Sequence, residues 1–251
     1  MSSPRSALRA LTVVEARLFL RDPAASLMTL GLPLGILFVF GIMPWAREAN
    51  ADFGGQAMLS VFVAPLSVTL LVGMLGLSLF PVILASYREK GVLRRMQGSP
   101  VSPATVLTAQ LTVYLGIGAI TVVVLMGLGI PVLGIEIPAN MPAVLVVLVL
   151  GTAALFSLGL LVGALAPSSK AANGIAMAAF FPMLALGGVW VPAEMLPSAL
   201  QWAAEALPMG AMFNSLRSAW AGDWPGWLPV TSLVVSTTVC LGIATRRFRW
   251  Q

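Results

Sequence analysis

Charged residues are spaced so unevenly along this chain that they divide it into long apolar stretches. Six runs contain no Asp, Glu, Lys, Arg or His: residues 23–46, 53–87, 96–135, 137–169, 171–193 and 224–245. Because a helix rises about 1.5 Å per residue, each run is long enough to cross a hydrocarbon layer of roughly 30 Å. The runs are continuously apolar, which favours helices over a closed barrel of alternating strands. The pattern predicts an all-α membrane protein with six transmembrane helices.

Prolines and polar loops mark the expected ends of these helices. We expect spans at 26–45, 58–85, 104–130, 143–166, 172–190 and 227–245. Ser102 and Pro103 supply a cap and a first helical position for the third span. The six spans occupy most of residues 1–251, so we expect a single membrane domain.

The first 25 residues differ from the spans because charges occur throughout them. Leu11, Val14 and Leu18 recur at helical spacing, whereas Arg5 falls on another face. This pattern predicts that residues 1–25 form an amphipathic helix on the cytosolic membrane surface. A charged leader without that role is the alternative.

The stretch 191–226 is too polar for a clean span and too apolar for a free loop. Prolines interrupt it, and five of the seven tryptophans lie in or beside it. Tryptophan gathers where membrane meets water, so the stretch is expected at the outer boundary. We expect two short re-entrant helices that dip into the outer leaflet. One interfacial helix on the surface is the alternative.

Composition and charge set the orientation. The chain is 59% hydrophobic and 9% charged, too few polar residues for the surface of a soluble protein. With the N-terminus in the cytosol, twelve Lys and Arg residues lie on the inner side and two, Arg47 and Arg217, on the outer side. This bias predicts cytosolic N- and C-termini. The net charge of +5 then reflects topology and contact with anionic lipids, and no nucleic-acid binding is expected.

The residues that several kinds of functional site require are absent from this sequence. The chain has no His and one Cys, Cys240, so neither a metal site nor a disulfide framework is expected. The six runs lack the ionisable group that proton-coupled carriers and intramembrane proteases need. Lys90 precedes Gly91 and Lys170 precedes Ala171, so neither belongs to a P-loop. Uphill transport therefore requires energy from another polypeptide, and we do not expect an enzyme.

The cytosolic loop 86–103 holds the densest polar motif. Residues 87–97 can form a short helix that ends before Gly98 and Pro100. Its arginines are expected to point outward: Arg88, Arg94 and Arg95. Its apolar side chains are expected to cluster: Val92, Leu93 and Met96. A basic loop that only fixes topology is the alternative, but it does not explain Glu89 or the apolar cluster.

This loop resembles a motif of type-2 ATP-binding-cassette (ABC) exporter permeases. The matching residues are Arg88-Glu89, Gly91-Val92-Leu93 and Ser99-Pro100-Val101-Ser102-Pro103. They resemble the pattern RE-x-G-x-L followed by TPVSP, with Ser99 where the family more often has Thr. The resemblance extends over nearly the whole chain, including a looser match in Met195-Leu196-Pro197 and Leu207-Pro208.

The resemblance implies one permease chain of a transporter in a bacterial plasma membrane. A second permease chain, identical or homologous, and a soluble ABC ATPase that carries ATP and Mg are the implied partners, and this chain needs no cofactor. The implied coupling residues are Arg88, Glu89, Gly91, Leu93, Arg94, Arg95 and Met96. The implied exit residues are Pro192, Leu196, Pro197, Leu207 and Pro208.

The cargo is expected to be hydrophobic or amphipathic, such as a drug or a lipid. Polysaccharide exporters line their path with aromatic residues, but this chain has two Tyr and boundary tryptophans. Polysaccharide or glycolipid export stays open, as do an ion-coupled secondary carrier and a scaffold or insertion factor. Asn173, Phe180 and Met183 are possible pathway residues, and Asn173 can instead form an interhelical hydrogen bond.

Overall fold

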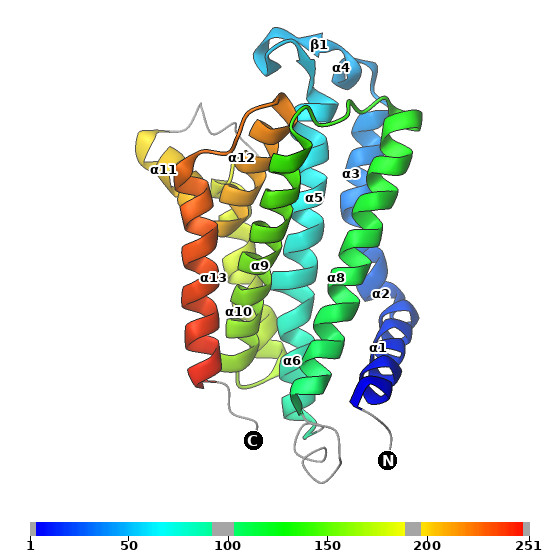
Figure 1. The fold of residues 1–251 in the computed structure, drawn as a ribbon, viewed down its shortest axis with the longest axis vertical. Helices are drawn as coiled ribbons and strands as arrows, with labels where there is room; N and C mark the ends of the chain where they lie inside the picture. Colours follow the sequence, from blue (N-terminus) through cyan, green and yellow to red (C-terminus); the bar gives the residue numbers. More distant parts are fainter. Residues whose placement is uncertain (1–3, 92–102, 189–196, 248–251) are drawn as a thin grey trace.

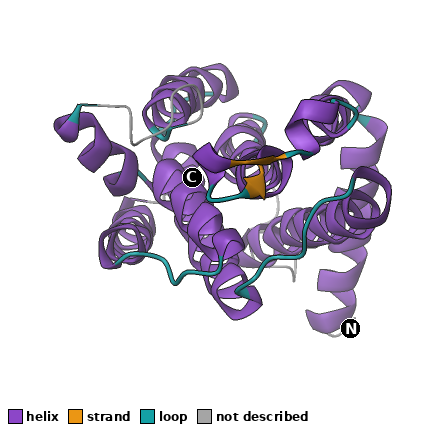
Figure 2. Cartoon of the chain, turned by 90° about the horizontal axis from the view of Figure 1, so that it is seen from above, coloured by secondary structure: helices purple, strands orange, loops and turns teal. Residues whose placement is uncertain are grey.

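The long helices of this protein lie side by side in one bundle. A computed structural model describes residues 4–91, 103–188 and 197–247. Helix α1 begins and helix α13 ends at the same end of the bundle (Figure 1), which we call the basal end. The opposite, distal end carries a two-stranded hairpin and the connection that precedes α9 (Figures 1 and 2).

The described helices and strands follow one another along the chain in the order below. The first half contains α1 (Pro4–Arg21), α2 (Pro23–Ser26), η1 (Leu27–Gly31), α3 (Leu32–Gly41), α4 (Pro44–Arg47), β1 (Ala49–Asn50), η2 (Ala51–Phe53), β2 (Gln56–Ala57), η3 (Leu59–Val63), α5 (Ala64–Gly73), η4 (Met74–Leu79) and α6 (Phe80–Glu89). The second half contains α8 (Pro103–Leu128), η5 (Gly129–Leu133), α9 (Met141–Leu165), α10 (Ser169–Leu186), α11 (Ser198–Ala206), α12 (Pro208–Ala221) and α13 (Trp227–Arg247).

Most of the expected spans are present as long apolar helices. Within the described residues, five helices are long and apolar enough to cross a membrane: Leu59–Glu89, Thr105–Leu133, Met141–Leu165, Ser169–Leu186 and Trp227–Arg246. The helix expected as the first span is shorter, Leu27–Gly41. A mainly helical fold with five candidate membrane spans is therefore confirmed, whereas the sixth crossing stays a prediction.

Prolines inside the first two spans coincide with local changes in helix type. The π-helical turns η1, η3 and η4 each end two residues before a proline: Pro33, Pro65 and Pro81. Proline has no N–H and its ring clashes with the carbonyl four residues earlier, so the preceding turn widens. These turns could not be expected from apolar periodicity, because they depend on how each proline is accommodated.

The loop after the first span is more ordered than a short external loop. Strands β1 and β2 pair antiparallel, with Ala49 opposite Ala57. Gly54 and Gly55 connect them with φ values of 65° and 82°. These left-handed conformations favour glycine, so the two glycines permit the tight turn. The N–H of Gly55 donates to the carbonyl of Asn50 at 3.0 Å, a turn that sequence alternation does not indicate.

The second span, from η3 to α6, forms the centre of the bundle and crosses α9 at very short range. A Cβ atom built on Gly159 would lie 1.9 Å from the carbonyl oxygen of Gly76. Beside this crossing the ring of Phe156 covers Gly76, and the Phe80 and Phe156 rings lie 5.7 Å apart. One turn further toward the basal end, a Cβ on Gly163 would meet Leu84 at 2.8 Å. Small residues therefore set the distance between these two spans.

The described part of 191–226 forms two short helices, α11 and α12, in place of one interfacial helix. Four large α12 side chains are buried: Met209, Met212, Phe213 and Leu216. The Arg217 guanidinium lies 5.3 Å from the Phe62 ring centroid and 5.8 Å from that of Phe213. Helix α12 thus packs inside the distal half of the bundle, and its entry into the outer leaflet stays a prediction.

The crossing of η4 and α9 should not tolerate a larger residue at Gly159. Gly159→Ala forces the two backbones apart, and overpacking of this kind costs about 1–3 kcal/mol. We expect a lower melting temperature in detergent, measured by fluorescence-detected size exclusion after heating. Gly116→Ala on α8 is the matched control, because no atom lies within 4 Å of the added Cβ. Equal melting temperatures for the two variants contradict the proposed role of the crossing.

Candidate functional site at the basal end

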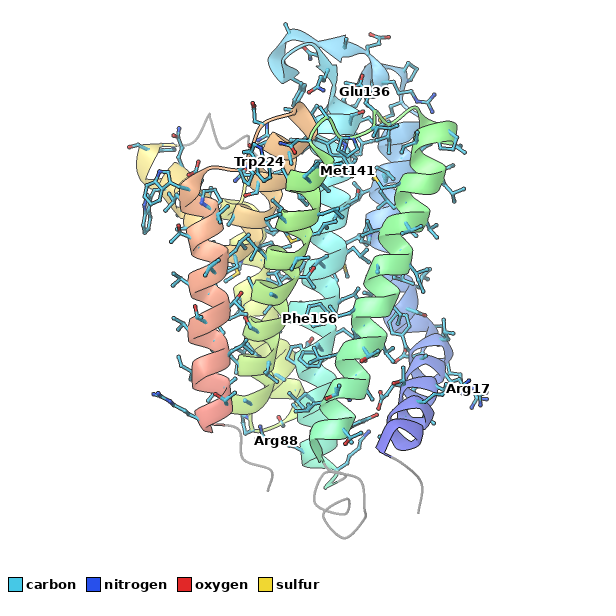
Figure 3. All side chains as sticks on the ribbon, viewed as in Figure 1. Arg17, Arg88, Glu136, Met141, Phe156 and Trp224 are labelled. Carbon is cyan, nitrogen blue, oxygen red and sulfur yellow. The ribbon has the colours of Figure 1, made fainter. Side chains whose placement is uncertain are left out.

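Three consecutive residues at the end of α6 contact three different elements. We call Tyr87, Arg88, Glu89 and their partners the basal junction. Successive helical residues point about 100° apart, so a single turn can reach several neighbours. Figure 3 labels Arg88 at the basal end of the bundle, where α6, α9 and α10 come together.

Arg88 binds the C-terminal end of α9. Its Nη1 donates to the carbonyl oxygens of Gly163 at 2.9 Å and Ala164 at 2.7 Å, and its Nη2 donates to that of Ala166 at 3.2 Å. The last carbonyls of a helix have no partner within the helix, and a cation there is also favoured by the helix dipole. The expectation that Arg88 points outward is thus corrected, because these carbonyls lie within its reach.

Glu89 binds the N-terminal end of the next helix, α10. Its Oε2 accepts hydrogen bonds from the backbone N–H of Ser169 at 3.0 Å and from the Ser169 hydroxyl at 2.8 Å. The preceding residue, Ser168, caps the same helix end by accepting from the N–H of Ala171 at 3.2 Å. A carboxylate and a serine together satisfy N–H groups that α10 itself cannot pair.

Tyr87 connects α6 to α1. Its hydroxyl donates a hydrogen bond of 2.8 Å to Oε1 of Glu15, a residue that is 7% exposed. Burial raises the pKa of the Glu15 carboxyl, and the hydrogen bond from Tyr87 offsets part of this rise. Next to this pair, the Phe19 ring packs edge-on against Tyr114 of α8 at 6.2 Å.

Helix α1 therefore has two distinct long faces. Glu15 and Phe19 face the bundle, whereas Val14 and Leu18 of the predicted apolar stripe are both 50% exposed. The stripe does not pack on this chain, so it is free to contact lipid. Location of α1 in the membrane interface stays a prediction.

The remaining predicted site residues are spread over the chain. Gly91 has φ of +63° and ends the turn after α6. Pro197 precedes α11, and Leu207 and buried Pro208 connect α11 to α12. Six of the predicted site residues lie outside the described residues: Leu93, Arg94, Arg95, Met96, Pro192 and Leu196.

The three possible pathway residues on α10 differ in exposure. Asn173 is exposed and Met183 is half-buried, whereas Phe180 is buried and lies beside Gly73 of α5. Phe180 thus packs within a single chain, and only Asn173 and Met183 present surface beyond it.

Sequence reasoning missed the partners in the basal junction: Glu15, Ser169 and the α9 carbonyls. Nothing in the sequence indicates that residues 167–170 lie next to Glu89. The structure also has two hollows away from the junction. A polar one of about 310 Å³ lies between α11 and α12, and an apolar one of about 610 Å³ lies between α8 and α9. Among the described residues no group of His, Cys, Asp and Glu could hold a metal ion.

Comparison with known proteins identifies the class of this helical membrane protein. A family model described as "ABC-2 type transporter" matches residues 6–220. The chain is also similar to the "Probable multidrug ABC transporter permease YbhS" of Escherichia coli strain K12 and of Escherichia coli O157:H7. Each is 22% identical over 195 residues, which is 76% of this chain and 52% of the relative. The chain thus spans about half the length of the curated relatives that it matches.

Because the family model covers most of the sequence, the chain belongs to the ABC-2 type transporter family. It is an integral membrane permease, as its long apolar helices also indicate.

Glu15 should make the docking of α1 depend on pH. A raised pKa in the docked state means that docking is strongest below the ordinary value of 4.5 and weakens as pH rises through the raised pKa. Glu15→Gln keeps an acceptor for Tyr87 and stays neutral, so its docking should not change with pH. The mobility of a spin label on Leu18→Cys, in a Cys240→Ala background, measures this between about pH 5 and about pH 8. Equal pH dependence in both proteins contradicts the assignment.

Proposed function

We propose that this chain is the transmembrane subunit of an ATP-driven exporter and that segment 86–103 docks a separate ABC ATPase. The supporting observation is the position of this segment. Its residues Tyr87 to Glu89 belong to the basal junction, so the part of the segment beyond Gly91 starts at a point connected to α1, α9 and α10. Membership of the ABC-2 family implies a partner ATPase. The docking surface consists of the coupling residues beyond Gly91: Leu93, Arg94, Arg95 and Met96.

Energy for transport has to come from that partner. The six apolar runs contain no Asp, Glu, Lys, Arg or His, which disfavours ion coupling, and the two lysines lack P-loop neighbours. ATP and Mg therefore bind to the ATPase, and this chain supplies the path. An ion-coupled carrier is the alternative of a different class.

The basal end faces the cytosol of a bacterial cell in this proposal. Lys90, Lys170 and Arg246 lie at helix ends on this side, together with Arg17 and Arg21 of α1. Basic residues concentrate on the cytosolic side of membrane proteins, and their side chains also contact anionic lipid heads. Both termini are then cytosolic, and α11 and α12 lie near the outer surface.

Hydrophobic or amphipathic molecules, such as drugs or lipids, are the proposed cargo. The relatives' printed name, a probable multidrug permease, supports a drug. Two permease chains, identical or homologous, enclose the path, and the exposed face of α10 with Asn173 and Met183 is the part of this chain that we assign to it. The α11–α12 pair covers the exit, with Pro197 before α11 and Leu207 and Pro208 between the two helices. Pro192 and Leu196 are the other residues that we assign to the exit. Export of a polysaccharide or glycolipid is the alternative within the same class.

Capture of the ATPase tests the docking segment. Leu93→Asp places a charge on the proposed apolar docking surface, so a tagged variant in mild detergent should lose the ATPase that the wild-type chain retains. Mass spectrometry of the co-purified proteins measures this. Arg246→Glu, an exposed change at the basal end of α13, is the control and should retain the partner. Retention by Leu93→Asp places the docking surface elsewhere.

Transport in inside-out vesicles tests the energy source. With a fluorescent hydrophobic dye as cargo, uptake should stop on ATP depletion and continue with an uncoupler. The reverse result identifies an ion-coupled carrier. No vectorial movement of hydrophobic, glycolipid or polysaccharide cargo identifies a scaffold or insertion factor.

A further inference from the structure

We propose that Arg88 and Glu89 form an internal clamp, which makes the end of the second span and the α9–α10 turn move as one unit during transport. This inference rests on the proposed exporter function, because it assigns these two residues to transmission within the permease. They position the docking segment, and recognition of the ATPase is left to the residues that follow Gly91.

Arg88 forms one half of the clamp through hydrogen bonds to the C-terminal end of α9. Two α9 carbonyls accept from the guanidinium at 2.9 and 2.7 Å, the range of charge-assisted hydrogen bonds, and the carbonyl of the capping residue Ala166 accepts at 3.2 Å. The planar guanidinium presents several donors in a fixed geometry, which the single ammonium of lysine cannot reproduce. Arg88 is half-buried there, so it is directed into the protein and away from a soluble partner.

The Glu89 half holds the following helix at its first residue. Both hydrogen bonds of Oε2 come from Ser169, and only residues 166–168 separate the end of α9 from the start of α10. Two neighbouring residues of α6 therefore hold two neighbouring helix ends. A displacement of α6 along its axis has to carry α9 and α10 with it or break both sets of bonds.

The order of the two charges matches the order of the two helix ends. The cation contacts the negative C-terminal end of α9, and the anion contacts the positive N-terminal end of α10. Exchange of the two residues places each charge at the helix end that repels it. If the loop only fixed the membrane topology, the two orders of Arg and Glu would be equivalent, since the number of basic residues is the same in both.

The chain leaves the clamp through a fixed turn. Gly91 donates its N–H to the carbonyl of Arg88 at 3.0 Å and has a left-handed φ. The covalent path from the docking segment to the clamp is thus short. A shift of the ATPase surface reaches α9 and α10 through Arg88 and Glu89, and it reaches α1 through Tyr87 and Glu15.

Cross-linking of the permease alone tests the clamp first. In a Cys240→Ala background, Lys90→Cys and Lys170→Cys place thiols on either side of the Glu89–Ser169 contact, and a short bis-maleimide should join them in native membranes. Glu89→Ala and the exchange Arg88→Glu with Glu89→Arg should each lower the yield severalfold. Glu89→Gln keeps an oxygen for both Ser169 donors and should largely restore it. Unchanged yields in the first two variants overturn the clamp.

Transport measurements then separate a clamp from an ATPase anchor. With the clamp, Glu89→Ala still captures the ATPase, and cargo moved per ATP hydrolysed falls severalfold. Loss of capture with normal cross-linking makes Glu89 an anchor and overturns the proposal. Arg17→Ala, an exposed change on α1, is the control and should match wild type, and elution as a single size-exclusion peak confirms folding of each variant. If wild type captures no ATPase, the exporter function fails and the transport role of the clamp fails with it, whereas cross-linking still reports its geometry.

Discussion

The close crossing of the second span and α9 is the constraint on which the rest of this structure depends. The Gly76 carbonyl occupies the space that any Cβ on Gly159 would take, so the two backbones are in direct contact. In lipid, helices gain little from the hydrophobic effect and associate through close packing, for which small residues are suited. The same contact face continues through Gly163 to the last carbonyls of α9. The crossing therefore determines where Arg88 meets its partners.

The second span occupies this central position. Its helix is irregular in places, whereas its basal end is held by bonds to other elements. Residues 59–73 are all buried, and Pro65 and Pro81 follow widened turns within the span. Within the buried α5, Thr69 satisfies its hydroxyl by donating to the carbonyl of Pro65 at 2.8 Å. The least regular parts of the span lie at its distal start and in its middle, whereas its basal end is held by side-chain bonds to three elements. Bending in the middle does not require the basal bonds to break.

The sequence predicts the spans well because absence of charge reports directly on a lipid environment. The second, third, fourth, fifth and last predicted spans differ from the helices at their ends by a few residues, and the charge-free runs cover most of each helix. The sequence does not predict the contacts between the helices. The directions of Arg88 and Glu89, the burial of Phe180 and the contact between Gly76 and Gly159 depend on which helix faces meet. Apolar residues occupy every face of these helices, so their periodicity does not indicate which face packs.

Charged residues occur only at the ends of the described spans. A protein that acts on these spans through charged contacts can therefore act only at their ends. Apart from Glu15 of α1, the buried polar side chains of the described bundle are uncharged, and Thr121 and Ser157 donate to carbonyls of their own helices. Such bonds satisfy a hydroxyl in lipid but do not connect one helix to another. Charged side chains join α6 to α1, α9 and α10 at the basal junction. The described spans thus carry charge-assisted interhelical bonds at the end from which the proposed docking residues follow.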